Sequence, residues 1–231
     1  MSPCTDRGAA ATRAALLEAG LFCFSEQGFE GTSLRQLAER AGRPSSLIAH
    51  HFGNKEGLYL AVLKAMVAER PQGQFPGPFV GLEELRDDPV QAAELLRKLI
   101  VGVFKGMRDT FESGDPRRMA SFRLWQRAVR SPIPELEPLL RERLAPLRTQ
   151  IAACIQALRP DLPVREIPFW CALVYGQCVA NTMMHDFNQL VFGPDCYPES
   201  PDHMAEQIAD ITLRAIGAPP SSMPPTPGSP R

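Results

Sequence analysis

Apolar residues recur at helical spacing along most of this chain. The first predicted helix covers residues 7–27, where steps of three and four separate Ala10, Ala14, Leu17, Leu21 and Phe24. We expect it to end at Gly28, because glycine readily adopts the left-handed conformation that follows many helices. No convincing strand and no internal repeat is found, so the pattern predicts an all-α fold.

Two short helices joined by a tight turn are predicted next. Thr32 or Ser33 caps the first of them, and its inner face carries Leu34, Leu37 and Ala38. Gly42 supplies the turn. The second helix covers about residues 45–50, with Leu47, Ile48 and Phe52 as its apolar positions.

A fourth helix is predicted over residues 54–70, and the composition changes after it. Residues 71–81 are rich in proline and glycine and cannot continue a helix. We therefore expect a linker at residues 71–88, and helical spacing resumes at Pro89 and continues to about Glu112.

The rest of the chain is also predicted to be helical. Further helices are expected around Trp125 and over residues 135–158, 164–191 and 200–217. Pro146 should kink the helix that contains it, since proline removes one backbone hydrogen bond. The helix over 164–191 is apolar nearly all round and needs two surfaces to bury against, one of which could be a second subunit. Residues 218–231 are mostly Pro, Ser and Gly and are expected to be disordered.

The segment from Thr32 to Lys55 has the layout of a helix-turn-helix, a unit that places its second helix in the major groove of DNA. Residues 31–55 hold four basic residues and one acidic residue, whereas residues 71–231 hold 17 basic and 19 acidic ones. A local positive patch on a chain of net charge −1 suffices for phosphate contact.

This organisation predicts four parts. They are a helix-turn-helix DNA-binding domain with its connecting helix (1–70), a linker (71–88), a larger helical ligand-binding and dimerisation domain (89–217) and a tail (218–231). No apolar run approaches the ~20 residues that span a membrane. The N-terminus lacks the basic-then-apolar pattern of a signal peptide, so we expect a cytoplasmic protein without a membrane partner.

The stretches GFEGTSLRQLAERAG and HHFGNKEGLYLAV resemble the DNA-binding domain of the TetR family of one-component bacterial regulators, over about residues 10–66. Residues 89–217 are similar, more weakly, to the C-terminal domain of the CerR-like branch. The resemblance implies that Thr32 and Ser33 donate to phosphate, that Arg35 reaches a phosphate or a guanine edge, and that the following residues also contact DNA: Arg43, Ser45, Ser46, Leu47, His50, His51 and Lys55.

The tip of the second helix departs from the family pattern. The family's usual tyrosine is Ala49 here, so one phosphate anchor is absent. The usual capping Ser or Asn is Pro44, so we expect the helix start to shift or to use Ser45. A small Ser-Ser-Leu surface offers few bidentate contacts to bases, and no operator sequence is predicted from it.

The resemblance also implies a small-molecule pocket in the larger domain, whose occupancy alters the spacing of two DNA-reading helices. The candidate ligand residues are Phe104, Met107, Phe111, Trp125, Trp170, Tyr175, Gln177, Asn181 and His185. Ordinary core packing is the alternative for each of the aromatic and methionine side chains. The polar members are of interest because a mostly apolar pocket needs a few polar groups to orient its ligand.

The alternatives to a regulator are a metal-binding protein, an enzyme and an interaction protein. Adjacent histidines on a helix point about 100° apart, which suits two partners better than one metal ion. No nucleophile–base spacing or phosphate-binding loop supports an enzyme, and no cofactor is predicted. An all-α interaction protein without specific DNA binding stays open, on the strength of Pro44 and Ala49 alone.

The six cysteines lack any C-x-x-C pair and are expected to be small buried apolar groups: Cys4, Cys23, Cys154, Cys171, Cys178 and Cys196. Cys171 and Cys178 share a helix face, where packing is favoured over redox sensing. The predicted function is a homodimeric, ligand-responsive repressor. It binds a palindromic operator and pairs through the helices near 164–191 and 200–217.

Overall fold

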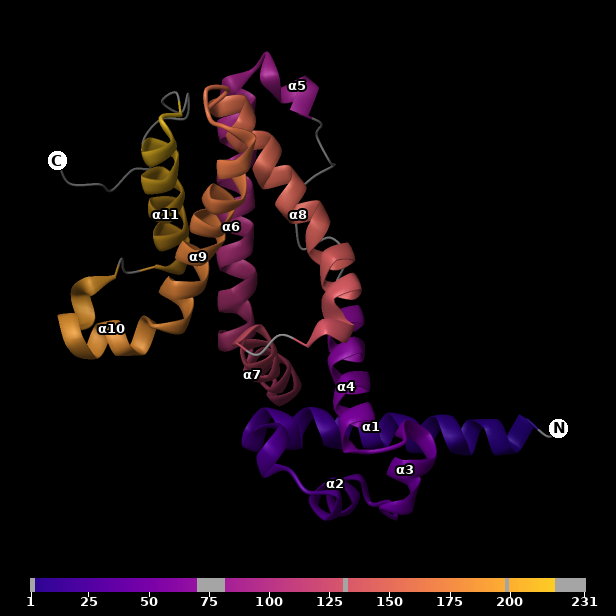
Figure 1. Ribbon diagram of the computed structural model, residues 1–231. Coiled ribbons are helices and arrows are strands. Elements are labelled where there is room, and N and C mark those ends of the chain that lie inside the picture. The colour runs from indigo at the N-terminus through magenta and orange to yellow at the C-terminus, as the bar shows by residue number, and fades with distance from the viewer. Residues whose placement is uncertain (1–2, 70–81, 131–132, 198–199, 219–231) are drawn as a thin grey trace. The chain divides into compact units, whose positions relative to one another are not determined.

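The computed structural model describes residues 3–69, 82–130, 133–197 and 200–218. These residues form helices joined by turns, with no strand among them, which confirms the all-α prediction (Figure 1). Contacts divide the chain into two compact units. Unit 1 comprises residues 1–71 and 110–143, and unit 2 comprises residues 72–109 and 144–231.

Unit 1 is built on a long first helix. Its elements are α1 (Pro3–Gly31), α2 (Leu34–Ala41), α3 (Ser46–Phe52), α4 (Lys55–Glu69), α7 (Pro116–Arg130) and the short 3-10 turn η1 (Pro134–Leu136). The backbone leaves the helical region at Gly28, with φ 75° and ψ 179°, where the sequence predicted the helix to end. A side chain at Gly20 would meet Val62 at 2.8 Å, so α1 and α4 cross closely there.

The helix α7 is part of unit 1, although the sequence division grouped it with residues 89–217. Its buried residues Ala120, Leu124 and Ala128 recur every four positions and join the core of α1 and α4. The guanidinium of Arg117 adds ion pairs to Glu18 of α1 at 3.0 Å and to Glu69 of α4 at 2.7 Å. A buried stripe and two ion pairs therefore fix α7 to the N-terminal helices.

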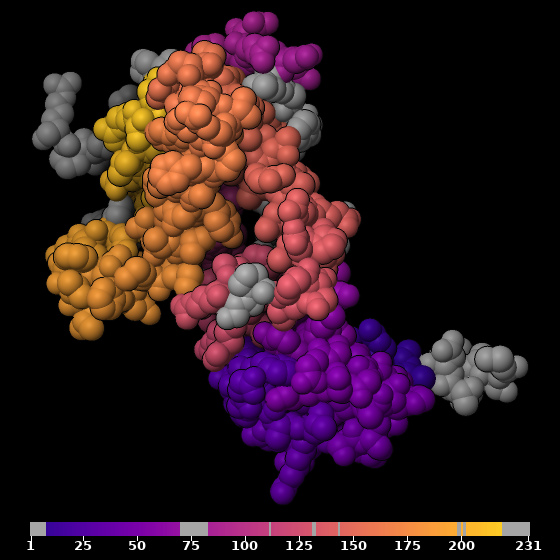
Figure 2. Space-filling model, in the orientation of Figure 1, coloured from indigo at the N-terminus to yellow at the C-terminus, as the bar shows by residue number. Residues whose placement is uncertain are grey.

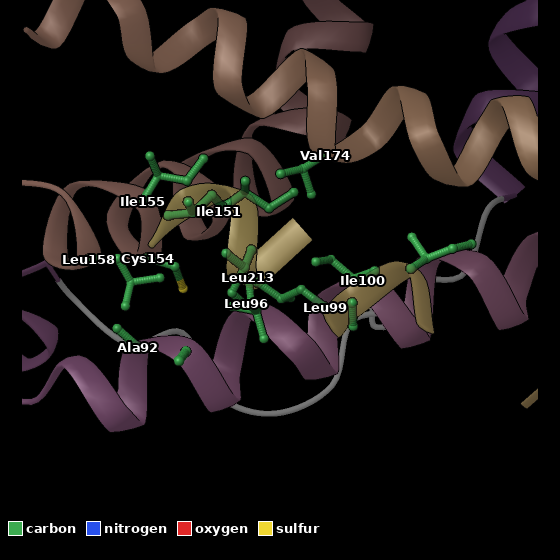
Figure 3. Close-up of a cluster of buried hydrophobic side chains, with 14 of the residues drawn as sticks. Ala92, Leu96, Leu99, Ile100, Ile151, Cys154, Ile155, Leu158, Val174 and Leu213 are labelled. Carbon is green, nitrogen blue, oxygen red and sulfur yellow. The ribbon is translucent and has the colours of Figure 1, made fainter. Parts of the chain in front are cut away.

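Unit 2 is a bundle of antiparallel and crossing helices around one apolar core. Its elements are α5 (Leu82–Arg86), α6 (Pro89–Glu112), α8 (Glu137–Leu158), η2 (Val164–Glu166), α9 (Ile167–Met183), α10 (His185–Phe192), η3 (Pro194–Cys196) and α11 (Pro201–Ile216). The helices α6 and α8 have residues in both units. The core side chains come from α6, α8, α9 and α11, with Leu85 from α5, and Figure 3 shows Leu96, Ile155, Val174 and Leu213 converging.

The predicted single helix over 164–191 is wrong. The chain forms α9 and α10, and Met184 between them has φ −101° and ψ 11°, outside the helical region. The ring of His185 stacks on that of Tyr197, with centroids 4.7 Å apart. The amide of Asn188 donates to the Tyr197 hydroxyl. These contacts hold α10 against η3, and apolar periodicity alone could not reveal them.

Other predicted boundaries agree closely with the structure. The helix at Pro89–Glu112 has the predicted bounds, and Ser200 caps α11 by accepting from the His203 amide at 3.1 Å. The helix α8 continues through Pro146. The short helix α5 lies in the expected linker and was not predicted. Residues 70–81 and the tail 219–231 lie outside the described part of the chain.

Candidate nucleic-acid interface

The first helix of the helix-turn-helix begins at a complete capping box. The Ser33 hydroxyl accepts from the Gln36 amide at 3.2 Å, and the Gln36 side chain accepts from the Ser33 amide at 2.8 Å. At its other end Gly42 adopts the left-handed conformation (φ 60°, ψ 37°). Ser33 therefore fixes the start of α2, and Gly42 fixes the turn that leads into α3, as the sequence predicted.

The helix α3 begins at Ser46, after the unusual Pro44. Ser45 stands at the cap position but makes no capping hydrogen bond with its side chain. The first amides instead bond three residues back, from Leu47 to the Pro44 carbonyl and from Ile48 to the Ser45 carbonyl. The helix start has thus moved to this tighter turn, which leaves the Ser45 hydroxyl without a capping role.

The exit from α3 depends on Asn54, just before α4, and on Gly57 in its first turn. The Asn54 side chain caps α4 by accepting from the Gly57 amide at 2.8 Å. A Cβ atom at Gly57 would lie 2.0 Å from the Phe52 carbonyl oxygen, so only glycine fits there. This role of Gly57 could not be predicted from the sequence, because nothing local marks a close approach between successive helices.

Five of the ten predicted DNA-binding residues lie on α3 or at its cap. Ser45, Ser46 and His50 are exposed, as is Ala49, whereas Leu47 and His51 are half-buried. The two imidazole rings meet edge to face with centroids 5.0 Å apart. Figure 1 shows α2 and α3 on the same side of α1.

A shallow open hollow joins α2 to the start of α3. It is lined by Leu34, Arg35, Ala38, Glu39, Gly42, Arg43, Pro44 and Ser45. Arg35 is almost fully exposed, and its Nε donates to Glu39 at 2.8 Å, a hydrogen bond that raises the pKa of Arg35. Leu34, predicted on the inner face, is 44% exposed in this hollow.

Two predicted phosphate contacts are used inside the protein instead. Thr32 is buried, and its hydroxyl donates to the carbonyls of Gly28 at 2.7 Å and Cys23 at 3.2 Å. The Lys55 ammonium donates to the carbonyls of Phe29 at 3.1 Å and Thr32, and it stands over the Phe29 ring. Both side chains hold the end of α1 to the start of the helix-turn-helix.

The cations of the 31–55 window are therefore not all available to DNA. Arg40 pairs with Glu26 at 3.1 Å and lies over the Phe22 ring, so it stabilises the contact between α2 and α1. Arg43 is exposed and donates to the Gly42 carbonyl. From outside the window, Arg13 of α1 places its guanidinium 5.4 Å from the Phe52 ring centroid.

The candidate ligand residues are divided between the units. Phe104 is fully buried in the unit 2 core, and Met107, Trp170 and Tyr175 pack partly buried against it. Trp125, expected beside them, packs against the unit 1 core instead, because α7 belongs there. None of these residues lines either of the two described surface hollows. The side chain of Phe111 lies outside the described part.

The polar candidates cluster along α9 and its end. Gln177 accepts a hydrogen bond from Thr212 of α11 at 2.9 Å, and Asn181 donates to the Gln177 carbonyl at 2.9 Å. The Nδ1 atom of His185 is buried without a hydrogen-bond partner among the described residues. In the same part of the chain, no group of three or more metal-ligating side chains comes together.

The cysteines of the described residues are all free. Cys23, Cys154 and Cys178 are buried, and burial raises the pKa of Cys154 and of Cys178 to about 12. Cys196 is exposed, which corrects the prediction that every cysteine is buried. No described helix is long and apolar enough to cross a lipid bilayer.

Comparison with known proteins bears on the helix-turn-helix directly. The family described as bacterial regulatory proteins, tetR family, matches residues 16–62. The matched residues lie in unit 1 and include the whole of α2 and α3. The repressor AcnR of Corynebacterium glutamicum is 43% identical over 53 residues, which are 23% of this chain and 28% of AcnR. The regulator RutR of Escherichia coli K12 is 43% identical over 61 residues, 26% of this chain and 29% of RutR.

The similarity to these curated relatives spans less than a third of their length, whereas solved structures extend it to the whole fold. HlyIIR, a hemolysin II transcriptional regulator, superimposes with a TM-score of 0.53 over 88% of this chain and 97% of its own, at 17% identity. FadR of Bacillus subtilis, solved with stearoyl-CoA, superimposes with a TM-score of 0.51 at 17% identity, over 87% of this chain and 97% of its own. At such identities the likeness shows a shared TetR-type fold.

Proposed function

We propose that this chain is a homodimeric, ligand-responsive transcriptional repressor, which binds a palindromic operator and is released by a small, mostly apolar effector. The observation that carries the proposal is the face of α3 that exposes Ser46 and His50, in a helix-turn-helix similar to that of the TetR family. The similar AcnR is a transcriptional repressor by name. In this proposal Ser33, Arg35, Arg43 and the α3 face contact DNA.

Two observations support a homodimer. Each chain has one recognition helix, and its unit 2 exposes apolar side chains. One chain supplies a single short helix for the groove, and regulators of this type bind two half-sites about 34–36 Å apart, or a multiple of that. Phe169 and Leu173 of α9 are 64% and 40% exposed, and Ile211 of α11 is 56% exposed. Large exposed apolar side chains, where they gather into a patch, mark an interaction site.

The helix α10 adds to that surface. Phe187, Leu190 and Phe192 are 56%, 84% and 72% exposed. Figure 2 shows α10 standing out as a lobe from the other helices of unit 2. We assign α9, α10 and α11 to the dimer interface, in keeping with the predicted regions 164–191 and 200–217.

An effector site in unit 2 is supported by its side-chain chemistry. Trp170 and Tyr175 offer aromatic surface at the edge of the core, and His185 offers a buried Nδ1 that lacks a partner among the described residues. A mostly apolar site with few polar groups suits an apolar effector. FadR, of the same fold, holds stearoyl-CoA. The assignment of residues 89–217 to the CerR-like branch belongs to this proposal and rests on the sequence resemblance.

Release requires that the effector distinguish two states. An effector shifts the equilibrium only by its difference in affinity between the DNA-binding and the released conformation. We therefore expect the effector and the operator to weaken each other's binding by the same factor.

The test is a gel-shift titration with DNA from upstream of the chain's own gene, combined with light scattering of the purified protein. We expect a retarded band at low salt and a dimer mass. The variant Arg43→Ala should weaken retardation, whereas Lys64→Ala, on the exposed side of α4, should not. Folded protein that retards no duplex would rule the proposal out.

A further inference from the structure

Arg13 lies on α1, outside the helix-turn-helix and outside the matched residues 16–62. Its guanidinium nevertheless stands over the ring of Phe52, the last residue of α3, at 5.4 Å from the centroid. The Phe52 ring in turn lies 6.1 Å from the ring of His51. A cation from a residue far away in the sequence is thus held at the end of the proposed recognition helix.

Most of the cations that lie closer to α3 in the sequence already contact acceptors within the protein. Lys55 donates to the carbonyls of Phe29 and Thr32, and Arg40 pairs with Glu26. Arg35 remains exposed but pairs with Glu39. Arg13, by contrast, is exposed and makes no ion pair with the described residues. Its charge is therefore available to an external anion.

The residue one turn before Phe52 on α3 has no side-chain hydrogen-bond donor. Ala49 precedes Phe52 by three positions, so the two share one side of the helix, and Ala49 is exposed. A guanidinium beside an aromatic ring uses none of its N–H donors in a hydrogen bond to that ring, so these donors stay able to bind an anion. Arg13 therefore brings a cation next to a position of α3 that itself offers only the Ala49 methyl group.

We propose that Arg13 binds a DNA phosphate beside the groove that α3 enters, with Phe52 as the platform that orients it. The inference rests on the DNA binding proposed above and adds a contact from α1. A phosphate contact fixes the register of the protein on the duplex and carries no base information. Arg13 should therefore strengthen binding to every duplex by a similar factor.

The experiment measures affinity against potassium chloride concentration by fluorescence anisotropy. The probes are a labelled duplex from upstream of the chain's own gene and a scrambled duplex of equal length. The variants are Arg13→Gln, which keeps the aliphatic stem on the ring and removes the charge, and Arg13→Lys, which keeps the charge. Arg118→Gln is the matched control, because Arg118 is exposed on α7, on the other side of α1 from α2 and α3 in Figure 1.

We expect Arg13→Gln to lower affinity for both duplexes by the same factor and to flatten the slope of log K against log salt by about 0.9 for each bound copy. Arg13→Lys should keep the slope, and Arg118→Gln should match wild type. If Arg13→Gln keeps the slope of the wild-type protein, and the wild-type protein binds DNA, the role of Arg13 is overturned. The proposed DNA-binding function then still stands. A wild-type chain that binds neither duplex overturns the DNA-binding function and this contact together.

Discussion

The ammonium of Lys55 lies 3.1 Å from the carbonyl oxygen of Phe29, where it closes the end of α1. It also donates to the Thr32 carbonyl, and the Phe29 ring lies beneath it at 4.2 Å. The entry to α2 and the start of α4 are thus joined by one side chain. A residue that the family resemblance assigns to phosphate is, in this structure, a support of the helix-turn-helix.

We expect Lys55→Ala to lower the free energy of unfolding of unit 1 by about 1.5–3 kcal/mol, as for the loss of hydrogen bonds from a charged donor. The measurement is chemical denaturation followed by circular dichroism. Lys64→Ala, on the same helix and exposed, is the control and should be neutral. Below the unfolding transition, Lys55→Ala should keep the wild-type salt slope for DNA, and a slope flattened by about 0.9 per copy would show a phosphate contact instead.

A second prediction concerns the close approach at Gly57. A methyl group there would lie 2.0 Å from the Phe52 carbonyl oxygen, and backbone cannot yield as a side chain can. Gly57→Ala should therefore destabilise unit 1 by about 1–3 kcal/mol, as overpacking does. Gly8→Ala is the matched control, since Gly8 is helical with nothing within 4 Å, and it should be neutral or slightly stabilising. Equal melting temperatures for the two variants would contradict the geometry.

The helix-turn-helix could be predicted from the sequence because its determinants are local. Ser33 and Gln36 form a capping box three residues apart, and Gly42 ends α2 in the left-handed region. The pairing of α7 with α1 could not be predicted in this way. The contact between Arg117 and Glu18 joins residues 99 positions apart, and helical periodicity shows only that α7 has an apolar face.

The roles of single cations were the least predictable part of the site. Charge counting treats Arg40 and Lys55 like Arg43, although the first two are engaged with Glu26 and the Phe29 carbonyl. The break between α9 and α10 was missed for a similar reason. The stacking of His185 on Tyr197 is a contact across a turn, which a one-dimensional apolar pattern does not record.

A third prediction concerns the acidic residue in the hollow between α2 and α3. Glu39 pairs with Arg35 at 2.8 Å, so its carboxylate competes with a phosphate for the guanidinium and repels it. Glu39→Gln should raise affinity for duplex DNA several-fold, and Arg35→Ala should lower it. The double variant separates the two effects, because Glu39→Gln should gain less once Arg35 is absent. If both single variants keep the wild-type affinity, neither Arg35 nor Glu39 takes part in DNA binding.

A fourth prediction follows from the thiols of unit 2. Burial raises the pKa of Cys154 and of Cys178 to about 12, whereas Cys196 is exposed. At about pH 8 the two buried thiols remain protonated in the folded state, and only the thiolate reacts with alkylating reagents. Peptide mass spectrometry after iodoacetamide treatment should find Cys196 modified first, and Cys154 and Cys178 modified only after denaturation.

The same pKa shifts set the direction of a change in stability with pH. The unfolded chain loses these protons near pH 9.0, and the folded chain retains them up to about 12. The folded state therefore holds more protons over that window, and its stability falls as the pH rises through it. Replacing Cys154 and Cys178 by alanine should flatten this alkaline loss. A loss of equal steepness in the double variant would assign it to other groups.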